Sequence, residues 1–259
     1  MKISIVTICL NNDFLEKTIE SVINQTYIDF ELIIIDGGST NEKCIDTLSK
    51  YSSFKNIIIV SEKDKGIYDG MNKGIAKAKG DYIIFVNAGD ELISNNILDI
   101  AIQQIDNYDV IYGNLEVKEE NFKWTKEYPS ELSFSYFLKD TLPHPSTFIK
   151  RSLFEKFGYY DCNMKISSDW AFFISIICRH NISYKHISDV ISIFRYDGIS
   201  SKSENQQLIK IEKINFLKKN FSAYLTDYKQ LKKVEAMQTA LKNSRLIKFL
   251  SIIFKQLRF

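Results

Sequence analysis

The sequence opens with a short apolar run, Ile3-Ser4-Ile5-Val6-Thr7-Ile8, which predicts a buried β-strand. Residues 13–25 follow with apolar side chains at helical spacing, and the same alternation repeats along the first half of the chain. Further runs lie at 32–35, 57–60, 82–86 and 110–112, and further helical stretches lie at 41–51, 68–78 and 95–105. Runs that are apolar on both faces and separated by helices are typical of a parallel sheet covered on both sides. The sequence therefore predicts an α/β fold with a mainly parallel central sheet flanked by helices.

The pattern changes after Gly113. Residues 114–128 alternate like an exposed strand pair; further strands are expected at 146–149, 182–187 and 190–195, and helices at 131–139, 151–157 and 169–179. From Glu204 onward almost every residue favours a helix. Because there is no internal repeat and no linker rich in Pro, Gly or Ser, we expect one domain and one extension. The domain is predicted over 1–203, with halves 1–113 and 114–203, and the helical C-terminal extension over 204–259.

Composition excludes several classes of protein. With 259 residues, 45% hydrophobic and 25% charged, the chain is neither disordered nor collagen-like. The cysteines are Cys9, Cys44, Cys162 and Cys178. They form no Cys-x-x-Cys pair, so the sequence argues against a disulfide scaffold, a zinc knuckle or a redox motif, and we expect small core side chains in a reducing cytoplasm. No apolar run reaches the roughly 18 residues of a membrane-spanning helix.

Polar segments follow the first four apolar runs, at residues 9–12, 36–41, 61–66 and 87–90. In an open parallel sheet, ligands bind at the carboxyl ends of the strands. The segments contain carboxylates, hydroxyls and glycines, which suit a nucleotide. There is no Gly-x-Gly-x-x-Gly after the first run and no Gly-x-x-x-x-Gly-Lys-Ser/Thr in the chain, so the dinucleotide and P-loop phosphate cradles are excluded.

Four motifs follow one another in the first half of the chain: SIVT at 4–7, IDGGST at 35–40, DKGIYDGMNKG at 64–74 and FVNAGD at 85–90. The resemblance that they indicate extends over residues 2–200. The series resembles the family 2 glycosyltransferases, which have the GT-A fold. Among them it is similar to the bacterial transferases that build O-antigen, capsule and exopolysaccharide repeat units. The resemblance implies an inverting enzyme that moves a sugar from a nucleotide-sugar donor, UDP-linked, to a hydroxyl of a lipid-linked or growing surface glycan.

Seven residues of the first half are candidates for donor binding, and five of them precede residue 87. Asp36 can accept a hydrogen bond from a base N–H, and the matching Asp of the family contacts uracil; the alternative is that Asp36 only caps the following turn. Thr7 and Asn11 are expected to line the base and ribose pocket, with simple turn formation as the alternative. The resemblance implies that Asp64 and Lys65 contact the nucleotide sugar, and a lysine suits a phosphate.

Residues 87–90 stand where the family has its Asp-x-Asp element. There a carboxylate binds the divalent cation that bridges the two phosphates of the donor. Asn87 and Gly89 replace two acidic positions, so Asp90 is the predicted ligand of Mn2+ or Mg2+, which prefer oxygen ligands. Asn87 and Ala88 are expected to contact the nucleotide-sugar donor. The alternative for Asp90 is a helix cap.

The second half is expected to supply the acceptor site. By its match to the family's Ser-Asp pair, Asp169 is the predicted general base, which takes the proton from the acceptor hydroxyl as that oxygen attacks the sugar. His144 and Arg195 are candidates for contact with acceptor or phosphate, and Trp170 for a sugar-stacking wall. The alternatives are a structural His144 and a core Trp170.

The C-terminal extension is basic. Residues 229–259 hold eight Lys or Arg against one Glu, although the whole chain has a net charge of only +2. Residues 245–259 have the composition of a basic amphipathic helix that lies on an anionic membrane; the alternative is a helix packed on the protein's own core or on a second subunit of a homodimer. The family implies a polyprenyl-diphosphate-linked acceptor, so we expect a cytoplasmic protein at the inner membrane face. No nucleic-acid partner is expected.

Two other functions stay open. A catalytically silent GT-A-like module that binds nucleotide or glycan is compatible with Asn87 and Gly89, whereas the presence of Asp36, Asp90 and Asp169 together favours an enzyme. A nucleotidyltransferase would need a Gly-rich loop bearing Arg or Lys after the first strand, which this chain lacks. The sequence does not identify the sugar, the acceptor or the linkage.

Overall fold

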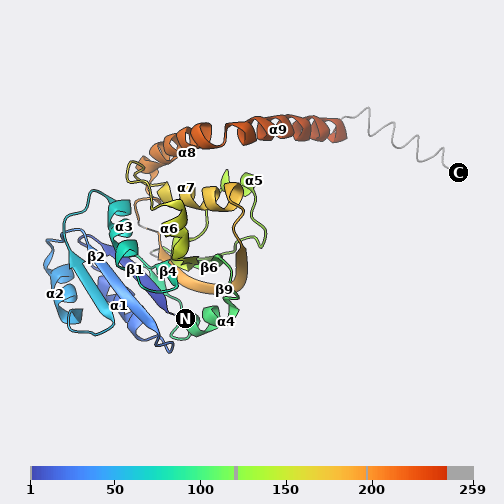
Figure 1. The fold of residues 1–259 in the computed structure, drawn as a ribbon. Coiled ribbons are helices and arrows are strands. Elements are labelled where there is room, and N and C mark those ends of the chain that lie inside the picture. The colour runs from blue at the N-terminus through green and yellow to red at the C-terminus, as the bar shows by residue number, and fades with distance from the viewer. Residues whose placement is uncertain (1, 120–121, 197, 244–259) are drawn as a thin grey trace. The chain divides into compact units, whose positions relative to one another are not determined.

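The computed structural model describes residues 2–119, 122–196 and 198–243. They contain a nine-stranded sheet (Figure 1) in which eight strands follow one another side by side and β7 (Lys123–Lys126) pairs with β6. The order is β3 (Ile57–Ser61), β2 (Phe30–Asp36), β1 (Ile3–Cys9), β4 (Tyr82–Phe85), β8 (Thr147–Lys150), β6 (Val110–Lys118), β9 (Tyr184–Arg195) and β5 (Glu91–Leu92). The predicted GT-A-like architecture is confirmed.

The first four strands of the order, β3 to β4, are parallel, as the apolar runs predict. Successive side chains of a strand point to opposite faces of the sheet. Ile5 of β1 belongs to a core cluster shared with α1 (Leu15–Ile23), α2 (Glu42–Tyr51) and α4 (Ile97–Gln104). Its neighbour Val6 lies against Gly74 of α3 (Ile67–Lys77). The sheet is therefore covered on both faces (Figure 1).

The second half departs from the expected strand pattern. β8 is antiparallel to both of its neighbours, β4 and β6. The two strands expected at 182–187 and 190–195 are one strand, β9, and the run at 110–112 continues through Gly113 to Lys118. The pairing of β6 with β9 shifts register at Gly113, where an added Cβ would lie 2.5 Å from a side-chain carbon of Ile191. The break in the sequence pattern thus marks a bulge inside a strand, where only glycine fits.

Aromatic side chains cover the second face of the sheet beyond α3. The expected helix at 131–139 is reduced to α5 (Phe134–Phe137), while α6 (Ser152–Phe157) agrees with the prediction. α7 (Ser168–Ile174) continues into a π-helical turn at Ser175–Arg179. Rings from β4, α6, α7 and the loop before α7 contact one another: Phe85, Phe154, Tyr160, Phe172 and Phe173.

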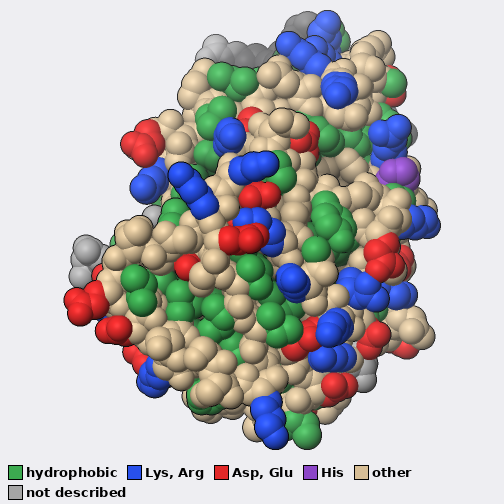
Figure 2. All heavy atoms as spheres, turned by 60° about the vertical axis from the view of Figure 1, so that its left-hand side comes forward, with side chains coloured by type: hydrophobic (Ala, Val, Ile, Leu, Met, Phe, Trp, Pro, Cys, Tyr) green, Lys and Arg blue, Asp and Glu red, His purple; other side chains and the backbone are tan. Residues whose placement is uncertain are grey.

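The C-terminal part is helical, as expected, with α8 (Gln206–Asn220) and α9 (Ser222–Asn243). The chain divides into two compact units, residues 1–212 and 213–259; the predicted division at 203/204 stays a prediction. The predicted amphipathic helix at 245–259 lies outside the described residues. Within the described ranges, no helix is both long and apolar enough to cross a membrane. Figure 2 shows acidic and basic side chains interspersed on one face of the molecule.

Candidate active site

The loops after β1 and β2 are joined by Asn11. This residue has a left-handed backbone, with φ of 51°, which asparagine tolerates better than most residues. Its Oδ1 accepts hydrogen bonds from the backbone N–H groups of Thr40 at 2.7 Å and Asn41 at 3.0 Å. Its own backbone N–H donates to the Ser39 hydroxyl at 2.7 Å. The turn-forming alternative for Asn11 is therefore present in the structure, and its contact with a donor stays a prediction.

Asp36 ends β2 and is 3% exposed. Its Oδ1 accepts a hydrogen bond from the backbone N–H of Ser39 at 2.9 Å, so the capping alternative is also present, beside the predicted role in reading the base. Thr7 is fully buried, and its hydroxyl donates to the carbonyl of Val86 at 2.7 Å. Thr7 therefore links β1 to the end of β4, which is a structural role, and its place in the base and ribose pocket stays a prediction.

Lys73 is surrounded by carboxylates. Its Nζ lies 2.6 Å from Asp64, 3.0 Å from Glu62 and 3.4 Å from Asp69, and the side chain is only 22% exposed. The hydrogen bond to Asp64 raises the pKa of Lys73, and burial opposes this shift only in part. Lys73 therefore holds Asp64 at the carboxyl edge of the sheet.

Two glycines of the motifs make room for Asp64. A Cβ at Gly70 would lie 2.8 Å from Asp64 Oδ2, and one at Gly37 would lie 3.0 Å from the same atom. The motifs at 35–40 and 64–74 therefore converge on one carboxylate, since a larger residue at either position would displace it. The backbone N–H of Lys65 donates to Asp69 at 3.0 Å at the start of α3, and the Lys65 side chain is exposed.

The loop at 87–90 contains a buried hydrogen-bond acceptor for which the described residues offer no donor. Asn87 Oδ1 is buried and has no hydrogen-bond partner among the residues that the structure describes. The Ala88 carbonyl accepts from the side-chain amide of Asn12 at 2.9 Å. Asp90 is 5% exposed, and its Oδ1 accepts from the backbone N–H of Arg195 at 3.1 Å. A hard divalent cation takes oxygen ligands, so the orphan amide oxygen and the nearby carboxylate fit such an ion.

Arg195 ends β9 and lies beside the loops after β1 and β4. Besides its backbone bond to Asp90, its guanidinium carbon lies 3.5 Å from the centre of the Phe14 ring, a cation–π contact. The structure therefore brings Arg195 and Asp90 together, although the sequence assigns them to different halves of the domain. Contact of Arg195 with phosphate or acceptor stays a prediction.

Asp169 lies in the first turn of α7. Its Oδ1 is 2.7 Å from the hydroxyl oxygen of Tyr68, which is also 2.6 Å from the carbonyl of Ile166. Tyr68 is 4% exposed, and burial together with the charge of Asp169 raises its pKa well above the ordinary value. The hydroxyl therefore stays protonated and can donate to the carboxylate. The sequence analysis missed Tyr68, although it stands in the middle of the motif at 64–74.

The segment before Asp169 is held by Glu212 of α8. The Glu212 carboxylate accepts hydrogen bonds from three consecutive backbone N–H groups, those of Lys165, Ile166 and Ser167. Glu212 belongs to the extension that the family resemblance does not cover. No local pattern marks it, because an exposed-looking Glu in a charged helix is common.

His144 and Trp170 are buried, as the structural alternatives for them expect, and their contact with the acceptor stays a prediction. His144 is 9% exposed, its Nε2 lies 2.8 Å from the Tyr160 hydroxyl, and its ring stacks on Phe85 at 4.4 Å. Burial lowers the pKa of His144, and the charge of Asp169 opposes the shift. Trp170 is 1% exposed and its indole N–H donates to the carbonyl of Phe137 at 2.7 Å. The structure therefore has the features of the two alternatives, a structural His144 and a core Trp170.

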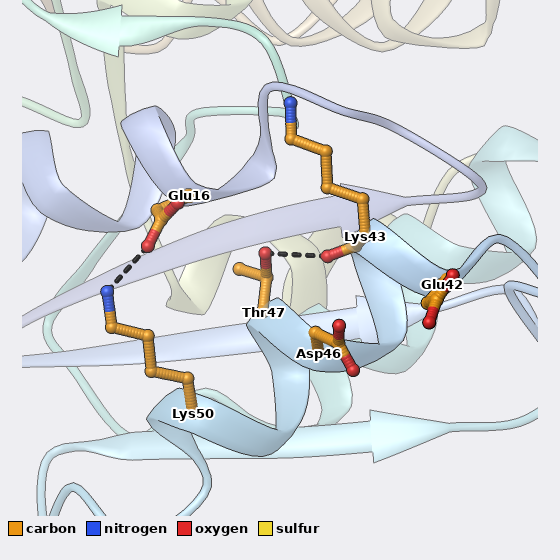
Figure 3. A pocket seen from close by; sticks show the side chains of 6 residues that line it. All are labelled: Glu16, Glu42, Lys43, Asp46, Thr47 and Lys50. Carbon is orange, nitrogen blue, oxygen red and sulfur yellow. Dashed lines mark hydrogen bonds and ion pairs between the residues drawn. The ribbon is translucent and has the colours of Figure 1, made fainter.

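A polar surface hollow lies elsewhere, on the outer side of α1 and α2 (Figure 3). Its lining consists of Glu16, Glu42, Lys43, Asp46, Thr47 and Lys50. Lys50 and Glu16 form an ion pair at 2.6 Å across it. None of the predicted site residues lines this hollow, so we do not assign it to the reaction.

Comparison with known proteins identifies the family of the chain. Residues 4–168 match the model of Glycosyl transferase family 2. The chain belongs to this family. The glycosyltransferase is 27% identical over 201 residues to the PGL/p-HBAD biosynthesis glycosyltransferase of Mycobacterium bovis, covering 76% of this chain and 77% of the relative. It is 30% identical over 187 residues to an uncharacterised glycosyltransferase of Mycobacterium tuberculosis, covering 68% and 70%.

Solved structures share the fold of this glycosyltransferase. Residues 1–349 of Staphylococcus aureus TarS in complex with UDP give a TM-score of 0.62 at 18% identity, covering 83% of this chain and 66% of that chain. The mannosyltransferase PcManGT from Pyrobaculum calidifontis, in complex with GDP-Man and Mn2+, gives 0.57 at 14% identity, covering 74% and 56%. The predicted GT-A fold and enzyme class are confirmed: the chain is a glycosyltransferase that uses a nucleotide-sugar donor.

Proposed function

We propose that this glycosyltransferase inverts the configuration of the transferred sugar and that Asp169 is its general base. The observation that carries the proposal is the hydrogen bond between Tyr68 and Asp169. Tyr68 stands in the donor motif at the start of α3, and Asp169 stands in the acceptor half. A buried donor from one half thus orients the carboxylate of the other, as a positioned base requires.

In the proposed reaction, the acceptor hydroxyl gives its proton to the Asp169 carboxylate while its oxygen forms the new bond to C1 of the sugar. The bond from C1 to the diphosphate breaks on the opposite face, and the nucleoside diphosphate leaves with the electron pair. Tyr68, still protonated, holds the carboxylate in place through its 2.7 Å contact. Asn87 and Asp90 would hold Mn2+ or Mg2+, which neutralises the charge of the leaving diphosphate when bound.

We assign the donor to the UDP sugars. Asp36 offers a carboxylate acceptor to a base N–H, and the matching edge of cytosine is itself an acceptor, so the contact favours uracil. The TarS chain solved with UDP-GlcNAc shares the fold with a TM-score of 0.62, which makes a UDP-hexosamine the first donor to try. Asp64 and Lys65 follow β3 at the same edge of the sheet, where the donor's diphosphate and sugar are proposed to lie.

The acceptor is proposed to be a lipid-linked or growing surface glycan, of the O-antigen, capsule or exopolysaccharide kind. Support comes from the motif resemblance and from the basic composition of residues 229–259, which suits an anionic membrane surface. A polyprenyl-diphosphate-linked sugar at the cytoplasmic membrane face would agree with both the motif resemblance and the basic composition. The silent-module alternative is favoured by one observation only, the absence of a carboxylate at Asn87 and Gly89.

Thermal stabilisation by UDP, GDP, dTDP and CMP, with and without Mn2+, tests the donor assignment. A ligand at 100 times its dissociation constant adds about 2.7 kcal/mol of stability, which such a measurement resolves. UDP is expected to stabilise most, and more strongly with Mn2+. Stabilisation by GDP alone would contradict the uracil assignment, and no stabilisation by any nucleotide would support the silent module.

The variant Asp169→Asn tests the base. It is expected to keep the stabilisation by UDP and to lose transfer from a UDP sugar by about three orders of magnitude, within the range attributed to general bases. The matched control is Asp161→Asn, because Asp161 is exposed and the hydrogen bonds described for its side chain go only to Asn163. Full activity of Asp169→Asn would exclude Asp169 as the base.

A further inference from the structure

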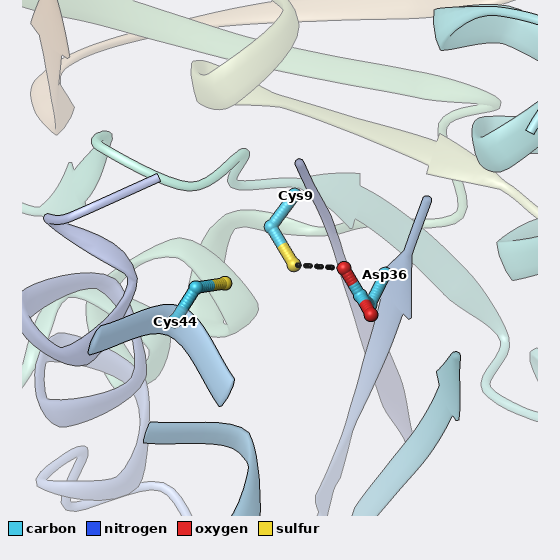
Figure 4. Close-up of side chains that lie close together, drawn as sticks. All are labelled: Cys9, Asp36 and Cys44. Carbon is cyan, nitrogen blue, oxygen red and sulfur yellow. Dashed lines mark hydrogen bonds between the residues drawn. The ribbon is translucent and has the colours of Figure 1, made fainter. Parts of the chain in front are cut away.

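Three potential metal ligands meet at the carboxyl ends of β1 and β2 (Figure 4). Cys9 and Asp36 are partners in the register of these two strands, and Cys44 lies in the first turn of α2. The two sulfur atoms and a carboxylate oxygen all lie within 4.8 Å of one another, and Cys9 Sγ is 3.9 Å from Asp36 Oδ1. All three residues are buried.

The ligand set is typical of a thiophilic cation. Thiolates select Zn2+ and its heavier relatives over Mg2+ or Mn2+, and zinc also accepts a carboxylate oxygen. Each thiolate lies about 2.3 Å from zinc, so two of them on one tetrahedral ion are about 3.8 Å apart. The atoms of this cluster already lie within 4.8 Å of one another, and small side-chain rotations can bring them to the separations that zinc needs.

Neighbouring groups already fix the ligands. The backbone N–H of Ser39 donates to Asp36 Oδ1 at 2.9 Å, and the Ser39 hydroxyl lies 3.4 Å from Cys44 Sγ. Partners of this kind orient the ligands of metal sites.

We propose that Cys9, Asp36 and Cys44 bind one Zn2+ ion, and that this ion excludes the nucleotide base from the donor site. The exclusion rests on the proposed function, because it assumes that Asp36 reads the base; the binding of zinc does not. A carboxylate that ligates zinc cannot also accept the N–H of uracil in the same position. The site differs in place and chemistry from the oxygen-lined site at Asn87 and Asp90. Zinc would therefore act as an inhibitor where Mn2+ or Mg2+ assists.

Titration of the reduced full-length protein with Cd2+, in the absence of nucleotide, tests the site. Cd2+ replaces Zn2+ on thiolates and produces an ultraviolet sulfur-to-metal charge-transfer band. We expect the band to saturate at one equivalent and to be lost in Cys9→Ser and in Cys44→Ser, with zinc affinity lowered about 100-fold or more. The matched control is Cys162→Ser, because Cys162 is exposed and lies outside the cluster; it should keep the band.

A further variant separates loss of a metal ligand from misfolding, which could also remove the band in the two buried cysteine variants. Asp36→Asn keeps both thiols, so the band is expected to persist while the affinity for Cd2+ falls about tenfold or more. Absence of a band in the wild type, or an unchanged band in Cys44→Ser, would overturn the site.

Competition with UDP tests the exclusion. Saturating UDP is expected to weaken Cd2+ binding by the wild type, and Cd2+ is expected to weaken UDP binding reciprocally. If Cd2+ binds but UDP has no influence on it while still stabilising the protein, the exclusion is wrong. If UDP fails to stabilise the protein free of Zn2+ and Cd2+ in the presence of Mg2+, the donor assignment fails, and the exclusion with it, while the zinc site stands.

Discussion

The hydroxyl of Tyr68 lies 2.7 Å from Oδ1 of Asp169, and this contact joins the donor motif to the acceptor half of the domain. Tyr68→Phe removes the hydroxyl that donates this hydrogen bond and leaves the aromatic ring in place. A hydrogen bond to a charged group contributes about 1.5–3 kcal/mol, so kcat is expected to fall about 10- to 100-fold while the KM for the donor changes little. Steady-state kinetics check this. Tyr159→Phe, on a residue that is 47% exposed, is the matched control and should retain the wild-type kcat.

Lys73→Met is expected to destabilise the protein, because three carboxylates lose their shared counter-ion. The cost is about 1 kcal/mol, since the network is partly screened by solvent. The pKa of Lys73 is raised in the folded state, so its contribution is fully present below the ordinary lysine value of about 10.4 and is lost as pH rises through the folded value. Urea denaturation near neutral pH measures the cost, and the exposed Lys77→Met should show none.

Protonation of His144 is expected to oppose folding. Burial lowers its pKa from 6.5, so the unfolded chain binds this proton more readily. Stability should therefore fall as pH decreases below about 6.5 and until the folded value is passed. Denaturation at a series of pH values measures the slope. His144→Phe should reduce the slope, whereas Tyr160→Phe keeps the imidazole and should retain it; equal slopes in wild type and His144→Phe would contradict the assignment.

Asn87→Asp adds a carboxylate where the family's metal element is acidic. The orphan Oδ1 of Asn87 becomes a charged ligand, so the affinity for Mn2+ is expected to rise about tenfold, because ligand charge strengthens binding of hard cations. Titration of the Mn2+-dependent stabilisation by UDP measures it. Asn95→Asp adds the same charge at an exposed position and should leave the affinity unchanged. An unchanged affinity in Asn87→Asp would remove Asn87 from the metal site.

Glu212→Gln is expected to loosen the segment before Asp169. The carboxylate accepts three backbone N–H bonds, and an amide accepts them more weakly than a charged group does. Hydrogen exchange at residues 165–167 should accelerate, and kcat should fall about tenfold. Glu204→Gln, on an exposed residue of the same region, is the control. Normal exchange in Glu212→Gln would show that the segment is held by other contacts.

Much of the site was within reach of the sequence. The motifs at 35–40, 64–74 and 85–90 predict Asp36, Asp64 and Asp90 at one edge of the sheet. The structure has Asp36 at the end of β2, Asp64 in the loop after β3 and Asp90 in the loop between β4 and β5. Burial was harder to predict. His144 and Trp170 stand in segments that could equally line a cleft, and only the packing of Phe85 and Phe137 against them decides that they are interior.

The sequence by itself determined the local elements and the family. Hydrophobic periodicity depends on residues close in the chain, so the strands and helices of the first half follow from it directly. Tertiary structure alone decided which distant residues meet. Cys9 faces Cys44 and Tyr68 meets Asp169 because strand order and helix packing bring separate segments together, and no local pattern encodes that order. The same reason explains β9, where the two strands expected at 182–187 and 190–195 form one strand that pairs with β6 on both sides of a register shift.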